Sequence, residues 1–167
     1  MGLIKNLKYS KQFDCQIGCA HLSFFNSDVE VLIEKDVSLE YAEKCIKHIN
    51  NLNPETIVFL VDRLNKYCNF MLDAWSDFDI YDSVVENIKT KMSNMNSASD
   101  ILQHVKPTMF VVTKPEGSEI AYSLEGECVW EPEHGVDIII KGNQLLYVGP
   151  VQCLGPWCDD EEYKCLF

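Results

Sequence analysis

The chain has 167 residues, and its 26 Asp and Glu against 14 Lys and Arg give a formal net charge of −12. The length fits a single domain over residues 1–167, and a hydrophobic fraction of 47% excludes an intrinsically disordered chain. The acidic balance argues against direct nucleic-acid binding, because contact with phosphates requires clustered Lys and Arg. No run approaches the roughly 18 apolar residues of a membrane-spanning helix, and the first residues lack the apolar core of a signal peptide.

The N-terminal part predicts a β-hairpin. Residues 20–25 and 29–34 are rich in apolar side chains, and a short polar turn at 26–28 lies between them. In the second run apolar and polar residues alternate, which is typical of a strand with one buried face. We expect the side chains of Val29, Val31 and Ile33 to face the core.

Three helices are predicted for the middle of the chain. Ser38 is a good N-cap for the first, whose apolar residues recur at helical spacing up to Leu52. Asn53 and Pro54 then form an N-cap and a first helical residue, and they precede the strongest periodic stripe in the chain. A weaker third helix is predicted at 82–92.

The remainder reads as a loop, a short helix and several strands. Residues 93–99 are polar and predict a loop, after which Asp100 is expected to cap a short helix, 101–105, that Pro107 ends. Strands are predicted at 108–113, 120–125, 136–140 and 144–148, and the last two form a hairpin through the turn 141–143. Because strands and helices are segregated along the chain, the sequence predicts an α+β fold. We expect a largely antiparallel sheet, made of the N-terminal hairpin plus the C-terminal strands and packed by about three central helices.

Eight cysteines lie at positions 15, 19, 45, 68, 128, 153, 158 and 165. Their spacing does not match the paired pattern of structural zinc sites, and a chain of this length does not need disulfide crosslinks. A free thiol at a helical core position behaves as a small hydrophobe. We therefore expect reduced, mostly buried thiols in a cytoplasmic protein, with no metal and no cofactor.

One string, residues 128–135, contains residues that could carry chemistry. His134 lies between Glu131, Glu133 and further acids, and a histidine beside a carboxylate is the pair that general acid–base catalysis uses. The alternative is a turn between two strands, in which the charges are solvated. We expect the turn. A small hydrolase or metal-dependent enzyme centred on His134, Glu131 and Glu133 is the second hypothesis.

Enzyme activity has little other support in the sequence. No nucleophile elbow, HExxH motif or phosphate-binding Gly-rich loop occurs. Arg63 is the only arginine beside 13 lysines, although the guanidinium is the group that holds phosphates and carboxylates through two hydrogen bonds. Because it lies in a predicted helix next to Asp62, we expect a surface ion pair.

The acidic residues are strongly clustered. Three segments without Lys or Arg, 73–86, 116–137 and 159–162, hold 16 of the 26. The first also interleaves aromatic residues with acids, and aromatic anchors within a charged rim are typical of protein–protein contacts. In the alternative interpretation, the aromatic side chains pack into the core while the acids face water. Partner contacts are predicted at Asp73, Trp75, Asp77, Phe78, Asp79, Asp82, Glu131, Glu133 and Asp137.

The string WEPEHGVDIIIKGNQLLYVGP, residues 130–150, and the following Pro156-Trp157 carry a resemblance to known proteins. They resemble small acidic bacterial proteins with a domain of unknown function, found among immunity proteins of polymorphic and contact-dependent toxin systems. The resemblance implies a cytosolic bacterial protein that binds and neutralises a toxin, often a nuclease, and it supplies no catalytic residues.

The leading hypothesis from the sequence is therefore an immunity (antitoxin) protein without enzyme activity. Nuclease toxins are commonly basic because they hold RNA or DNA, so an acidic protein can attract and shield that surface. The expected partner is a basic protein, and neither nucleic acid nor a membrane is expected to bind directly.

Overall fold

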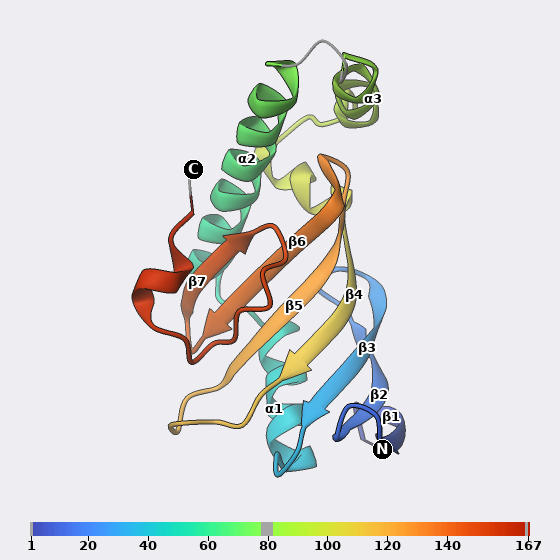
Figure 1. Cartoon of the computed structure of the whole chain (residues 1–167), viewed down its shortest axis with the longest axis vertical. Helices are drawn as coiled ribbons and strands as arrows, with labels where there is room; N and C mark the ends of the chain where they lie inside the picture. Colours follow the sequence, from blue (N-terminus) through green and yellow to red (C-terminus); the bar gives the residue numbers. More distant parts are fainter. Residues whose placement is uncertain (1, 78–81, 166) are drawn as a thin grey trace.

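The computed structural model describes residues 2–77, 82–165 and 167, and it places helices against one face of a large sheet (Figure 1). Seven described strands lie in chain order across this sheet, and all neighbours are antiparallel except the parallel pair β3 and β4. The predicted α+β class with a largely antiparallel sheet is confirmed. The strands are β1 (Lys5–Ser10), β2 (Cys15–Leu22), β3 (Ser27–Glu34), β4 (Val105–Val112), β5 (Ala121–Cys128), β6 (Glu131–Lys141) and β7 (Gln144–Gly149).

The N-terminal hairpin, β2 and β3, is confirmed, with its turn earlier than predicted. Ser27 and Asp28 already pair with β2, so the turn is formed by residues 23–26, where Asn26 has a φ of 49°. The predicted core-facing residues of β3 are buried. Strand β1 was not predicted, because a lysine-rich, mostly exposed edge strand has no apolar alternation to mark it.

The helical part of the chain connects the two parallel strands. It contains the three predicted helices, α1 (Leu39–Ile49), α2 (Pro54–Ser76) and α3 (Asp82–Met92). The Ser38 hydroxyl accepts a hydrogen bond from the Tyr41 backbone N–H (3.2 Å), and the Asn53 side chain accepts one from the Thr56 N–H (2.7 Å), so both predicted N-caps are confirmed. No described helix is long and apolar enough to cross a membrane.

The segment before β4 corrects one prediction. A 3₁₀-helix, η2 (Ala98–His104), begins inside the predicted loop with Ser97 as its N-cap, and the Asp100 carboxylate accepts hydrogen bonds from the N–H groups of Asn96 (2.7 Å) and Ser97 (3.0 Å). Pro107 does not end this helix, because it lies in β4. The pairing of β4 with β5 shifts register directly after Pro107, which accommodates a residue without an N–H.

A turn lies within the string 128–135 as predicted, but it does not start at Pro132, because Glu131–Lys141 form β6. The chain reverses one step earlier, at Val129 and Trp130. Gly135 has a φ of +63° beside the register shift between β5 and β6, as expected for a β-bulge. The hairpin of β6 and β7 is confirmed, with Gly142 at a φ of +54° in its turn.

The two faces of the sheet are covered differently. In Figure 1, α1 and α2 lie behind the sheet, while the segment after β7 crosses in front of β6 and β7. The main core lies on the helical side, where Phe110 of β4 and Trp130 of the β5–β6 turn are fully buried together with Leu64 and Tyr67 of α2. Alternate residues of the same strands point to the other face, which carries the features described below.

Candidate partner-binding surface

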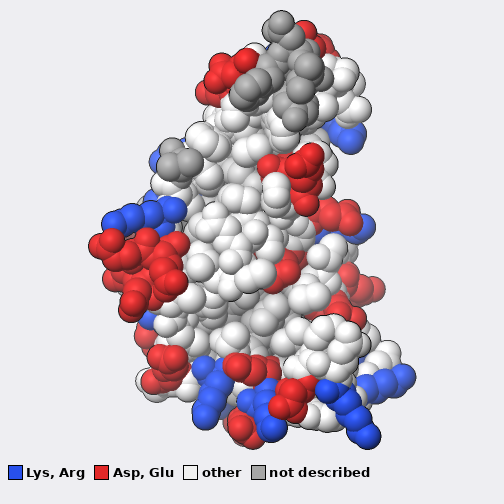
Figure 2. Space-filling model, in the orientation of Figure 1, with Lys and Arg blue, Asp and Glu red and all other residues white. Residues whose placement is uncertain are grey.

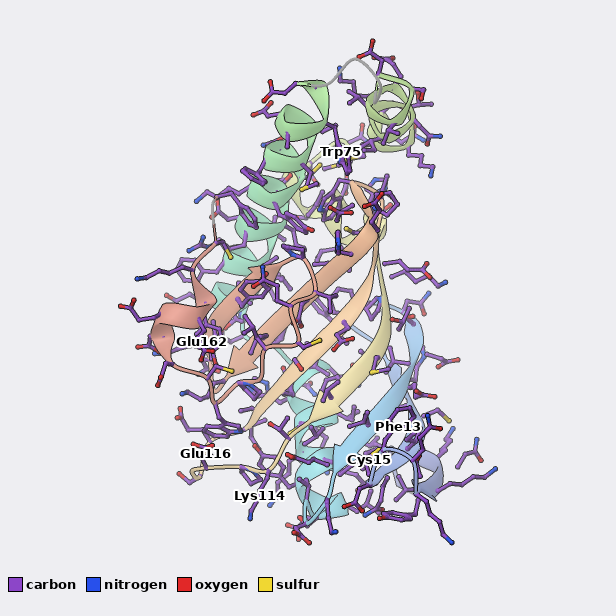
Figure 3. The ribbon with its side chains drawn as sticks, in the orientation of Figure 1. Phe13, Cys15, Trp75, Lys114, Glu116 and Glu162 are labelled. Carbon is purple, nitrogen blue, oxygen red and sulfur yellow. The ribbon has the colours of Figure 1, made fainter. Side chains whose placement is uncertain are left out.

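A contact between two tryptophans that are 55 residues apart in the sequence brings together the acidic segments 73–86 and 116–137. Trp75, in the last turn of α2, is half-buried, and its Nε1 donates a hydrogen bond to the Trp130 carbonyl oxygen (3.1 Å). Trp130 is fully buried at the turn between β5 and β6. Figure 3 shows Trp75 beside the end of this hairpin. Trp75 is therefore a packing residue that joins α2 to the sheet, as the alternative interpretation of its segment expects.

Four of the predicted contact residues form exposed acidic surface at this end of the molecule. Asp73 and Asp77 lie at the end of α2, Asp82 begins α3, and Glu133 lies near the start of β6; all four are exposed. We call them the acidic end, and Figure 2 shows acidic side chains there. The predicted contacts Phe78 and Asp79 lie outside the described residues.

Glu131 is buried and does not belong to this surface. Only 5% of the residue is exposed, and its Oε1 accepts hydrogen bonds from the N–H groups of Glu133 (3.0 Å) and His134 (3.2 Å). The Nδ1 atom of the exposed His134 side chain is 3.6 Å from the same oxygen. The carboxylate thus satisfies backbone donors at the bulge. The residues named in the enzyme hypothesis therefore comprise one buried structural carboxylate and two exposed side chains.

Asp137 is also removed from the surface. It is 0% exposed, and neither carboxylate oxygen has a hydrogen-bond partner among the described residues. Burial, together with the charge of Glu125 opposite it on β5, raises the pKa of Asp137 to about 7. Asp137 was predicted to be part of an acidic surface because it lies in an acidic segment of the sequence. Side chains alternate between the two faces of a strand, and that of Asp137 lies on a part of the sheet that is covered.

The acidic tail forms a second exposed cluster, far along the sheet from the first. Asp159, Asp160, Glu161 and Glu162 are all exposed at the short 3₁₀-helix η3 (Asp160–Tyr163), and Figure 2 shows them as a dense acidic patch at the left edge. One is paired, since Lys164 Nζ lies 2.8 Å from a Glu161 carboxylate oxygen. This cluster provides a natural comparison for the acidic end.

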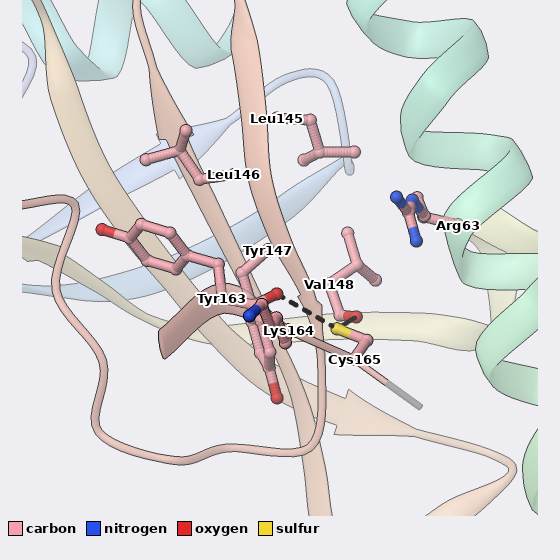
Figure 4. A pocket seen from close by; sticks show the side chains of 8 residues that line it. All are labelled: Arg63, Leu145, Leu146, Tyr147, Val148, Tyr163, Lys164 and Cys165. Atoms are coloured by element: carbon pink, nitrogen blue, oxygen red, sulfur yellow. Dashed lines mark hydrogen bonds between the residues drawn. The ribbon is translucent and has the colours of Figure 1, made fainter. Parts of the chain in front are cut away.

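Arg63 does not pair with Asp62, which instead contacts Lys66 (2.9 Å). Its Nη1 donates to the Phe167 carbonyl oxygen (3.1 Å). Arg63 also lines a cavity of about 290 Å³ between α2, β7 and the C-terminal segment, where Cys165 Sγ donates to the Val148 carbonyl (3.3 Å; Figure 4). The feature of the sequence that drew attention to Arg63 was that it is the single arginine of the chain.

The cysteines are less deeply placed than predicted. Four are buried, at positions 15, 45, 68 and 128, while three are half-buried and Cys153 is exposed. Burial raises the pKa of the Cys45 and Cys128 thiols to about 12, which makes them poor nucleophiles. Within the described residues, no group of three or more His, Cys, Asp or Glu side chains is arranged to hold a metal ion.

The fold and this surface define a small α+β domain with an acidic end. The family model of a domain of unknown function, DUF6985, matches residues 3–155. The chain therefore belongs to the DUF6985 family. Searches of curated proteins and of solved structures return no match.

Proposed function

We propose that this protein is an immunity (antitoxin) protein that binds and neutralises a basic bacterial toxin, most simply a nuclease, through its acidic end. The observation that carries the proposal is the Trp75–Trp130 hydrogen bond, since it brings two acidic segments to one end of the molecule. The resemblance of residues 130–150 to immunity proteins supplies the biological class. Membership of DUF6985 assigns no activity, so it neither adds to the proposal nor opposes it.

The electrostatics of the acidic end favour a basic partner. Asp73, Asp77 and Glu133 form none of the described ion pairs, so their charges are available to an approaching molecule. Like charges held close together repel each other, and a cationic partner relieves that repulsion on binding. The proposal places the protein in the cytoplasm, where free thiols persist.

A binding titration tests the proposal. The purified product of the adjacent upstream gene is titrated with the wild-type protein and with the triple variant D73N/D77N/D82N. We expect a complex at low salt that the triple variant weakens about tenfold, because three complementary charges are lost. Cells that express the gene product should survive only when the wild-type protein is present.

The control variant D159N/D160N/E161Q removes the same number of charges from the tail cluster. If net charge alone drove binding, both variants would weaken it equally, whereas a localised site predicts a much smaller effect of the control. The absence of any complex at low salt, or of any protection of cells, would contradict the proposed function.

A further inference from the structure

The second face of the sheet is covered over only part of its width. Residues 150–158, which we call the C-terminal strap, cross in front of β6 and β7 (Figure 1). The strap is held by hydrogen bonds from the Tyr147 hydroxyl to the Pro150 carbonyl (2.8 Å) and from the Val151 N–H to the His134 carbonyl (3.3 Å). Beneath it Ile139 is 0% exposed and Tyr147 is 2% exposed. The strap therefore completes a small second core over this half of the sheet.

The strap does not extend over the other half of this face, which is formed by β2, β3 and β4 (Figure 1). Ile17, Leu32 and Val111 are neighbours in the strand register, and Met109 lies one pair further along β4. All four are half-buried, and we call them the open sheet face. Apolar residues that lie partly exposed together on one sheet face are candidates for an interaction site.

Acidic residues flank the open sheet face on β3 and β5, while Lys8 of β1 pairs with Ile17 on its other side. Met109 lies between Glu30 on β3 and Glu125 on β5, and neither glutamate forms a described ion pair. Burial raises the pKa of Glu125, so its charged form would be stabilised by a nearby cation. A hollow of about 340 Å³ adjoins the face, and its lining includes Ile17 and Glu30 together with Lys8.

Charge decides between the two simplest occupants of this face. A second copy would bring together two chains that each carry a net charge of −12, and it would add acidic side chains to the unpaired glutamates. A basic partner with an apolar centre would instead bury the open sheet face and pair with its rim. Such an apolar centre with a polar rim is the usual anatomy of a protein–protein interface.

We propose that the open sheet face is the apolar core of the contact with the basic partner, and that Glu30 and Glu125 pair with Lys or Arg side chains on it. This inference rests on the proposed function and extends its surface from the acidic end onto the sheet. The partner segment would be an apolar patch flanked by basic residues, laid across β2, β3 and β4.

The test compares two double variants that make the same kind of change. L32T/V111T replaces two apolar residues of the open sheet face by threonine, which is polar and has a high strand propensity. L39T/V58T introduces threonine in place of two exposed apolar residues on α1 and α2. We expect the first variant to bind the upstream gene product at least about tenfold more weakly, because a few residues at the centre of an interface contribute most of the binding free energy. The control should bind like the wild type.

A second pair of substitutions, E30Q/E125Q, tests the rim without changing the size of any side chain. It should also weaken binding and make the dissociation constant less dependent on salt. If L32T/V111T and E30Q/E125Q bind like the wild type while D73N/D77N/D82N binds weakly, the sheet contact is wrong and the proposed function stands. If the wild type does not bind, both proposals fall. Sedimentation as a dimer that L32T/V111T abolishes would assign the face to a second copy and overturn this inference.

Discussion

Asp137 is the residue whose environment departs furthest from that of an ordinary surface acid. It is fully buried with Glu125 opposite on β5, and neither of its oxygens has a hydrogen-bond partner among the described residues. Leaving such a carboxylate charged inside a protein is costly, so the folded state favours the protonated form. The position of this one side chain therefore links the stability of the whole domain to pH.

We predict that stability falls as pH rises through the range that Asp137 controls. Its pKa is 3.8 in the unfolded chain and about 7 when folded, so between these values only the folded state holds the proton. The free energy of unfolding should decrease from about pH 4 to about pH 7, by on the order of 4 kcal/mol at most, and level off above. Urea unfolding of the wild type and D137N at several pH values measures this.

D137N should lose most of this pH dependence, because its side chain does not titrate. Glu125 also has a raised pKa and adds a change of the same sign. The control D77N alters an exposed acid and should retain the slope of the wild type. Equal slopes for D137N and the wild type would show that the carboxylate is solvated in the folded state.

Glu131 gives a second prediction at this scale. Its carboxylate accepts hydrogen bonds from the N–H groups of Glu133 and His134, so E131A should lower the free energy of unfolding by about 1–3 kcal/mol. E131Q keeps one acceptor oxygen and should cost less. E133A changes an exposed side chain and should stay within about 0.5 kcal/mol of the wild type. Chemical denaturation of the three variants provides the comparison.

At the scale of elements, α2 is the part of the fold that links the acidic end to the sheet. Its first turn is capped by Asn53, its middle buries Leu60 and Leu64 against the strands, and its last turn contacts the β5–β6 turn through Trp75. Tertiary contacts hold this helix at both ends and along its buried face, and they stabilise it more than helical propensity does. Its final turn depends most on the tryptophan contact.

We predict that W75F loosens this end while preserving the fold. The substitution keeps an aromatic ring and removes the hydrogen bond to the Trp130 carbonyl, so unfolding should become easier by about 1 kcal/mol. Amide hydrogen exchange should increase at the end of α2 and at the β5–β6 turn. W157F is the matched control, because the indole nitrogen of Trp157 has no hydrogen-bond partner among the described residues. Equal exchange in both variants would contradict a clamping role for Trp75.

At the scale of the whole molecule, the charge of −12 is distributed unevenly. The acidic end and the tail cluster hold several unpaired acids each, while basic residues such as Lys5 and Lys8 lie on the edge strand β1. A partner with a basic surface would be drawn toward the acidic regions from beyond contact distance. Binding should therefore depend on ionic strength through the association rate more than through the dissociation rate.

This prediction is checked by measuring both rates for the upstream gene product as salt is raised. Between about 0.05 M and about 0.5 M salt, the association rate should fall by roughly tenfold or more while the dissociation rate changes little. The triple variant D73N/D77N/D82N should show a shallower dependence. An association rate that does not respond to salt would argue against electrostatic steering.

The helices and most strands could be predicted because their signals are local. Ser38 and Asn53 cap helices through contacts only three residues away, and Gly142 marks a turn that two adjacent strands require. Strand β1 escaped prediction because an exposed edge carries no apolar pattern. Pro107 was misjudged because the register shift that tolerates it depends on β5, which lies later in the chain.

The residues of the candidate surface were likewise predictable only in part. An acidic α+β domain with clustered charge could be predicted from the residues alone, because composition depends on which residues are present and periodicity on their order. Which acids reach the surface could not be read from residue order: Asp73 and Glu133 are exposed, while Glu131 and Asp137 are buried in the folded chain. The physical reason is that burial depends on which distant segments pack together, and a run of acids in the sequence carries no information about what covers each of them.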